Sequence, residues 1–249
     1  MWQLLLLLIC WTGTLTAQGL AGVRNLDPAF LVSLGYGPFA PAGDLFDRFG
    51  AGFSLDAGLS YTPTDSRWQI GGMAQYGFGS EVKEDVLAGF RTDAGFIIGN
   101  QRQPATVELR QRQFFAGARL GYTIPLGDNP RAGLQLTTGA GYFFSRIRFQ
   151  QDPAQYVPQI DKLAQAGYDR LAGGPAIYQF IGYQQLGQDR RLNFYAGGEI
   201  MAGFTKQLRS FDIPLGSPPS PAGRTDIILG FKAGLIVPLY HGEGKEIYY

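Results

Sequence analysis

The feature that most constrains this chain is a strict alternation of apolar and polar residues, repeated in several runs. In residues 52–61, Phe53, Leu55 and Leu59 share one parity. Ser54 and Asp56 share the other. Because successive side chains of a β-strand point to opposite faces, this pattern predicts strands with one apolar face and one polar face.

Eight segments carry this pattern, and the connections between them are alternately long and short. The segments are residues 29–38, 51–62, 67–79, 105–125, 131–149, 176–186, 191–205 and 225–240. Outer-membrane barrels have an even number of antiparallel strands, short periplasmic turns and long external loops. The sequence therefore predicts an all-β fold, an eight-stranded antiparallel up-and-down transmembrane β-barrel with short periplasmic turns and long external loops.

The composition of the two faces supports a wall in lipid. In residues 225–240 the apolar face holds Leu229, Phe231 and Leu235, and the opposite face holds Asp226 and Lys232. A soluble barrel or sandwich would carry charge on its outer face, and the wall faces here have almost none. The parity of residues 176–186 stays open, because Gln179 and Gln184 lie on opposite faces.

Aromatic residues near the segment ends predict two interfacial girdles: Tyr61, Trp68, Tyr122 and Phe194 at the inner end, and Phe53, Phe78, Tyr142, Phe144 and Phe204 at the outer end.

The N-terminal residues 1–17 carry no charged side chain and end in small residues before Gln18, as expected of a signal peptide. The only cysteine, Cys10, would leave with it, so neither a disulfide nor a thiolate metal site is expected. The predicted organisation is a signal peptide at 1–17, a barrel at 18–240 and a periplasmic tail at 241–249. Both termini of the mature chain are then expected in the periplasm of a bacterium.

Charge and hydropathy exclude several classes of protein. The formal net charge of +1 provides no electrostatic footprint for nucleic acid. After the leader, no segment has the run of about 18 apolar residues that a transmembrane helix requires. Any membrane segment is therefore expected to be a β-strand.

Four ionisable residues are predicted near mid-strand on the inward face: Asp56, Arg119, Glu199 and Lys232. Charges at membrane depth pair with one another or line water. Two acids balance two bases, which suggests a neutral barrel-interior network. We favour a satisfied polar plug over a gated or proton-conducting lumen, because side chains usually fill eight-stranded barrels.

Enzyme chemistry has little support in the sequence. The only histidine, His241, follows the last predicted strand, and no nucleophile-elbow, zinc-protease or Walker motif occurs. Glu81, Glu84 and Asp85 are close together in an external loop, where a charge run usually forms a solvated surface. We therefore expect no catalytic residue, metal or cofactor.

One external loop contains apolar residues at helical spacing between residues 157 and 171, notably Ile160, Leu163 and Leu171. A short amphipathic helix there could cover the barrel rim as a lid or present an apolar stripe to a partner protein. We favour the lid, since apolar stripes mostly serve packing.

Several stretches of the C-terminal half resemble a family of small outer-membrane barrels of the Bacteroidota: GYDRL at 167–171, QFIGY at 179–183, RRLNFYAGGE at 190–199 and GFT at 203–205. More loosely, the whole mature chain is similar to eight-stranded barrels of the OmpA and OmpX type. The resemblance implies the fold and the outer-membrane location, and it brings no catalytic residues. By analogy, some small barrels of that phylum are similar to accessory subunits of outer-membrane assembly or secretion machines.

These observations favour a non-enzymatic structural or interaction barrel that presents its external loops, and the analogy suggests an accessory subunit of such a machine. The alternatives are a small pore or transport barrel and, less favoured, a lipid-modifying enzyme. The expected partners are outer-membrane lipid, the barrel-assembly machinery during insertion and an outer-membrane protein complex.

Overall fold

The computed structural model describes residues 26–99, 102–151, 157, 160, 168–187, 193–209 and 222–241. Eight long strands form one closed barrel: β1 (Ala29–Gly43), β2 (Gly52–Thr62), β3 (Trp68–Gly79), β6 (Val107–Pro125), β7 (Ala132–Gln151), β8 (Ala172–Leu186), β9 (Asn193–Gln207) and β10 (Arg224–Tyr240). All neighbours are antiparallel, and β1 closes the ring on β10 from the pair Ala29–Tyr240 to the pair Gly43–Asp226. The prediction of an eight-stranded antiparallel up-and-down barrel is therefore confirmed.

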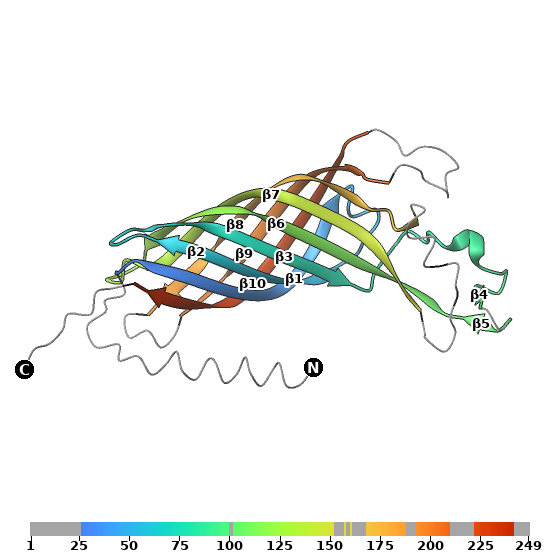
Figure 1. Cartoon of the computed structure of the whole chain (residues 1–249), viewed down its shortest axis with the longest axis horizontal. Helices are drawn as coiled ribbons and strands as arrows, with labels where there is room; N and C mark the ends of the chain where they lie inside the picture. The colour runs from blue at the N-terminus through green and yellow to red at the C-terminus, as the bar shows by residue number, and fades with distance from the viewer. Residues whose placement is uncertain are drawn as a thin grey trace, which may run out of the picture.

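The connections separate to the two ends of the barrel (Figure 1). We call the end with the short connections 63–67, 126–131 and 187–192 the turn end, and the end with the long connections 44–51, 80–106, 152–171 and 208–223 the loop end. The connection 80–106 contains a 3-10 helix, η1 (Ala88–Phe90), and a small hairpin of β4 (Ile97–Ile98) and β5 (Pro104–Ala105). Across the described ranges, no helix is long and apolar enough to span a membrane.

Two strands extend by four residues or more beyond their predicted ends. β1 continues to Gly43 and not only to Pro38, and β8 begins at Ala172 and not at Ala176. Pro38, the last residue of the predicted segment, and Pro175, in the β8 extension, are tolerated because the ladder is interrupted beside them: Gly37 and Pro38 pair with β2 but not with β10, and β8 has no pairing to β9 at Gly174 and Pro175. Pro41, in the β1 extension, pairs with Ile228 of β10 and lies beyond the last β1–β2 pair, Phe39–Gly52. A missing N–H group is harmless where no ladder bond is made.

Alternate side chains point into the barrel and outward. On β8, Tyr178, Phe180 and Gln184 are buried inside, whereas Ile177 and Gln179 face outward. This settles the open parity of that strand. The outward amide of Gln179 accepts a hydrogen bond of 2.6 Å from the hydroxyl of Thr138 on β7, so a polar group on the wall has a partner on the neighbouring strand.

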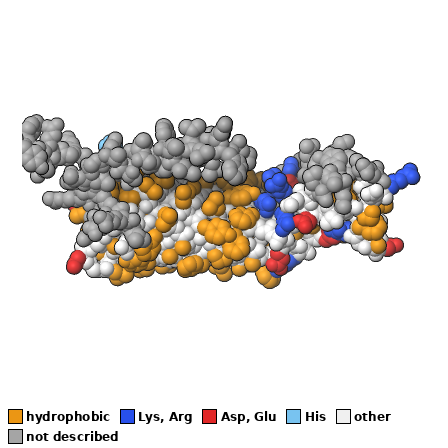
Figure 2. All heavy atoms as spheres, turned by 90° about the horizontal axis from the view of Figure 1, so that it is seen from below, with side chains coloured by type: hydrophobic (Ala, Val, Ile, Leu, Met, Phe, Trp, Pro, Cys, Tyr) orange, Lys and Arg blue, Asp and Glu red, His pale blue; other side chains and the backbone are white. Residues whose placement is uncertain are grey.

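On the face shown in Figure 2, many hydrophobic side chains lie on the middle of the outer wall, and most charged side chains lie beyond them towards the loop end. We call this zone of exposed apolar and aromatic side chains the hydrophobic belt. Aromatic pairs lie at both edges of the belt. Trp68 and Tyr122 are 4.7 Å apart between ring centroids at the turn end, and Tyr142 and Phe144 are 4.6 Å apart towards the loop end. A surface of this kind is typical of a wall that lipid covers.

Candidate functional site

A buried group of charged and polar residues crosses the middle of the lumen. The Nζ atom of Lys232 lies 3.0 Å from Oδ1 of Asp56 and 2.7 Å from Oε2 of Glu199. Gln75 accepts a hydrogen bond from Lys232 and donates one of 2.9 Å to Glu199, and the Tyr195 hydroxyl donates one of 2.9 Å to Asp56. We call these five residues the central plug. They come from β2, β3, β9 and β10, so the plug joins opposite walls.

Glycine and aromatic residues shape the lumen around the central plug. A Cβ atom at Gly35 would lie 2.1 Å from the Tyr195 hydroxyl oxygen, so only glycine leaves space for that side chain. The rings of Phe115 and Tyr178 stack with centroids 6.0 Å apart, and the Lys232 Nζ lies 5.3 Å from the Tyr178 centroid. The lysine is 1% exposed. Side chains therefore fill this level of the barrel.

Arg119, the fourth interior charge predicted from the sequence, has different partners. Its guanidinium donates hydrogen bonds to the hydroxyls of Ser60, at 2.8 Å, and Ser33, at 3.0 Å. It lines a cavity of about 40 Å³ on the turn-end side of the central plug, together with Gln69 and Gln135. A space of this size holds a few water molecules at most. The structure thus joins Asp56, Glu199 and Lys232 and places Arg119 beside them, in a polar chamber.

Arg131 closes the turn end of the lumen. Its guanidinium donates hydrogen bonds of 2.8–2.9 Å to the backbone carbonyls of Leu26, Asp27 and Pro63, and the residue is 2% exposed. Burial lowers the pKa of this guanidinium, and the nearby Tyr240 opposes that shift. The bonds tie the segment before β1 to the β2–β3 turn.

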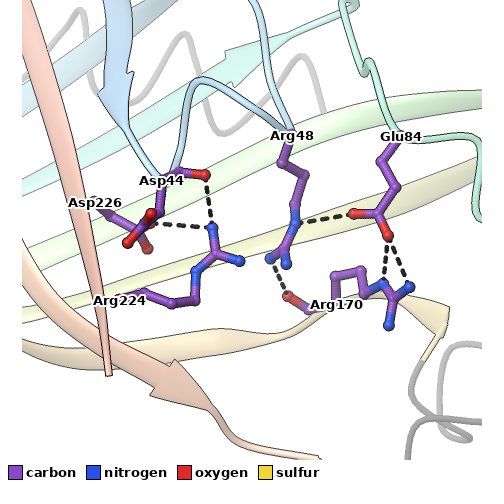
Figure 3. A network of polar contacts seen from close by, with 6 residues as sticks. All are labelled: Asp44, Arg48, Glu84, Arg170, Arg224 and Asp226. Carbon is purple, nitrogen blue, oxygen red and sulfur yellow. Dashed lines mark hydrogen bonds and ion pairs between the residues drawn. The ribbon is translucent and has the colours of Figure 1, made fainter. Parts of the chain in front are cut away.

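Ion pairs between loops close the other end (Figure 3). Glu84 lies between two arginines, 3.2 Å from the Arg48 Nε and 2.7 Å from an Arg170 nitrogen. Beside them, Arg224 pairs with Asp226 at 3.3 Å and donates to the carbonyl of Asp44. We call these six residues the outer ion-pair network. It links the connections 44–51, 80–106 and 152–171 to β10.

The expectation of a solvated charge run is wrong for Glu84, whose side chain is 33% exposed and held in two ion pairs. The physical reason is that the connections fold back over the barrel mouth and bring distant arginines to it. Asp85 does remain near the surface, paired with Arg91. Burial is the main cause that lowers the pKa of Arg48; Arg224 lowers it further and Glu84 raises it. The carboxylate of Glu84 therefore offsets part of the desolvation of Arg48.

A small apolar core packs beneath these connections. Leu45, Phe49, Leu87 and Ile97 are buried there together with Ile160, which is 2% exposed. Of the predicted partner-contact residues, Ile160 thus packs inward and offers no surface to a partner, because it belongs to this core. Leu171 is half-buried, and its carbonyl accepts a hydrogen bond from the Leu208 N–H group. Leu163 and most of the predicted helix lie outside the described residues.

Few groups suited to chemistry are present in the parts of the chain that the structure describes. His241 lies exposed at the turn end, where its backbone N–H group donates to Pro28. No cluster of three or more His, Cys, Asp or Glu residues that could hold a metal occurs within the described ranges.

The sequence analysis did not identify three residues of the lumen, Gln75, Tyr195 and Arg131, as partners in its polar contacts. The inward parity of Gln75 and Tyr195 was a signal for the first two.

Three solved structures with the same general shape align along almost their whole length. The attachment invasion locus protein Ail of Yersinia pestis, solved with the heparin analogue sucrose octasulfate, has 11% sequence identity and a TM-score of 0.40, with 85% of this chain and 99% of Ail covered. Neisserial surface protein A has 11% identity and a TM-score of 0.40, with 83% and 96% covered. The outer membrane protein OprG of Pseudomonas aeruginosa has 11% identity and a TM-score of 0.36, with 87% and 98% covered.

No protein-family model matches the sequence, and no curated protein matches it either. The resemblance to a Bacteroidota family stays a prediction.

Proposed function

We propose that this chain is an exported, non-enzymatic outer-membrane β-barrel with a closed lumen, whose work is done by its outer wall and its loop end. The observation that carries the proposal is closure at three levels: Arg131 at the turn end, the central plug at mid-height, and the outer ion-pair network with its apolar core at the loop end. The hydrophobic belt supports the location in a membrane (Figure 2).

Electrical recording in planar bilayers tests the closed lumen against the pore alternative. We expect a flat current trace from protein whose insertion is verified by vesicle flotation and by the slower migration of heated protein on gels. A steady unitary conductance from the folded protein would overturn the closed barrel. Failure to insert would overturn the membrane location.

The finer proposal is that the loop end contacts a protein machine of the outer membrane. A rigid surface supports this role, because the outer ion-pair network and the apolar core hold three connections together. Cross-linking from cysteines placed at exposed loop positions such as Phe46 and Ile98, followed by purification from native membranes, tests it. Recovery of one recurrent outer-membrane partner is the expected result, and recovery of the barrel alone contradicts it.

The orientation proposed from the sequence, with a cleaved leader at 1–17 and both termini in the periplasm, has its own test. In intact cells, the cysteine at Phe46 should react with a membrane-impermeant thiol reagent. A cysteine at Ser66, in the β2–β3 turn, should react only after the outer membrane is opened. The reverse pattern would show the opposite orientation.

A further inference from the structure

Four arginines gather on the outer wall of the β6–β7 hairpin near its loop end. Arg110 lies directly opposite Arg148, and Arg112 lies directly opposite Arg146. They alternate with inward residues such as Gln111 and Gln113, so all four are on the outward face. Like charges directly opposite each other destabilise a strand pair. Two such pairs in succession therefore favour the binding of a negatively charged group beside the hairpin.

The described part of the chain neutralises only part of this arginine patch, which we define as Arg110, Arg112, Arg146 and Arg148. Glu108 forms an ion pair with Arg110. Among the residues that the structure describes, no carboxylate forms an ion pair with the other three. Arg112 is anchored by a hydrogen bond of 2.7 Å to the carbonyl of its neighbour Gln111, and its buried Nε atom has no partner within the described ranges.

The arginine patch borders the hydrophobic belt on its loop-end side, and heights below are counted from the belt towards the loop end. The next pair along the hairpin towards the turn end is Phe114 opposite Phe144, and both rings are exposed. At about 3.3 Å per residue and a tilt of about 40°, two residues add about 5 Å of height. The pair of Arg112 and Arg146 is thus about 5 Å above the rings, within a headgroup layer about 5 to 7 Å thick, whereas the pair of Arg110 and Arg148, about 10 Å above them, lies just outside that layer.

A groove on the outer wall joins the two kinds of surface. It has a volume of about 360 Å³ and is lined by Arg112 and Arg146 and by Tyr76, Phe114, Phe144 and Leu171. The three aromatic residues share one level of the wall, next to the level of the two arginines towards the turn end. A lipid has the same division into a charged head and apolar chains. An acidic protein or polysaccharide would match the arginines but not the aromatic residues of the groove.

We propose that the arginine patch and this groove bind a phosphorylated lipid headgroup of the outer leaflet, with the phosphate on Arg112 and Arg146 and an acyl chain along Phe114 and Phe144. The planar guanidinium suits this role because it donates two parallel hydrogen bonds to phosphate oxygens. The proposal rests on the proposed membrane location. Beyond that location, the proposal names a preferred class of lipid and its binding site on the outer wall.

The test compares two double variants of equal charge change in a neutral maltoside detergent. Arg112→Gln/Arg146→Gln removes the groove arginines, and Arg67→Gln/Arg102→Gln removes two exposed cations away from the groove, one in the β2–β3 turn and one between β4 and β5. The probes are bisphosphorylated lipid A, the same lipid without its phosphates, and inorganic phosphate. Bound lipid is counted by native mass spectrometry, and the unfolding midpoint is followed by the loss of the compact band on gels.

We expect bisphosphorylated lipid A to bind the native protein and to raise its unfolding midpoint, and we expect binding to fall about tenfold or more in the groove variant only. Without lipid, the groove variant should unfold at the native midpoint or above it, because the repulsion between Arg112 and Arg146 is gone. This result also shows that the variant folds.

Equal binding by the groove variant, or equal stabilisation by the dephosphorylated lipid, would overturn the inference. An equal effect of inorganic phosphate would identify a free-anion site and overturn the lipid as its occupant. Insertion into phosphatidylcholine vesicles without lipid A is measured in parallel. Normal insertion with no preference for lipid A refutes this inference alone, whereas failed insertion refutes the membrane location.

Discussion

At the scale of single residues, Lys232 is the side chain that holds the central plug together, through its contacts with Asp56, Glu199 and Gln75. It is almost fully buried and contacts both Asp56 and Glu199. Desolvation of such a group is costly, and the cost is offset only while all its partners remain. With the further hydrogen bonds from Gln75 and Tyr195, each carboxylate oxygen of Asp56 and Glu199 has a donor.

Replacing Lys232 with methionine is expected to reduce the free energy of unfolding by about 3 to 5 kcal/mol, because two buried carboxylates lose their cation. Urea unfolding in vesicles, followed by intrinsic fluorescence, measures the change. The control is Lys206→Met at an exposed position on β9, where a change within about 0.5 kcal/mol is expected. Equal losses in both variants would contradict the role of Lys232 in the plug.

Parity alone was sufficient to place Asp56, Glu199 and Lys232 on the inward face, because a charge on the lipid side of a strand is costly. It could not identify Gln75 or Tyr195 as their partners, since neutral side chains carry no such penalty. The ion pairs of Glu84 could not be predicted from the sequence for another reason. Its partners Arg48 and Arg170 are in other loops, and only the folded connections bring them together.

At the scale of the strands, the barrel closes where β1 meets β10, and the two backbones approach each other very closely at Gly37. The ladder is interrupted at Gly37 and Pro38. A Cβ atom at Gly37 would lie 1.9 Å from the carbonyl oxygen of Phe231 and 2.7 Å from the Cα atom of Lys232. Backbone atoms cannot move aside as a flexible side chain can, so this position requires glycine.

Substitution of Gly37 with alanine is therefore expected to destabilise the barrel by about 1 to 3 kcal/mol, as overpacking does. Gly72→Ala on β3 is the matched control, because a Cβ atom at this outward position would lie 3.7 Å from its nearest neighbour, the carbonyl oxygen of Gly117. That control should be unchanged or up to about 1 kcal/mol more stable, owing to the smaller entropy of the unfolded chain. The folded fraction after refolding into vesicles, measured across urea concentrations, distinguishes the two. If Gly37→Ala left the free energy of unfolding unchanged, the backbone of β10 would have to shift to make space for the added methyl group.

The strands were predictable wherever alternation was unbroken, as in β2 and β3. The ends of β1 and β8 were not, because Pro38 and Pro175 usually mark the limit of a strand. Whether a proline ends a strand depends on the pairing of its neighbour, which is a property of the closed sheet and not of the local sequence.

At the scale of the whole molecule, the inner and outer surfaces have exchanged the roles they have in a soluble protein. The interior holds the ion pairs and the glutamines, and the outside holds the exposed aromatic and aliphatic belt. This arrangement is stable only if a nonaqueous medium covers the belt. The cost of a charge on the wall should consequently depend on its depth.

Two substitutions on the outward face of β10 test this dependence. Phe231 lies midway along the strand, level with the central plug, and Leu239 lies near the turn end. In a bilayer, Phe231→Arg should cost about 2 to 4 kcal/mol and Leu239→Arg about 0 to 1 kcal/mol. Urea unfolding from vesicles measures both. Costs of equal size would indicate a barrel surrounded by water.

The lysine of the central plug also has a consequence for the order of assembly. β10 is the last strand of the barrel in sequence order, and it closes the ring on the first. Until it arrives, β1 and β9 present open edges, and the carboxylates of Asp56 and Glu199 lack the cation that pairs with both. Completion of the wall and neutralisation of the lumen are thus one event. An incomplete barrel is marked by two unmatched negative charges, which only water can accommodate, and the final strand makes its interior compatible with a dry membrane.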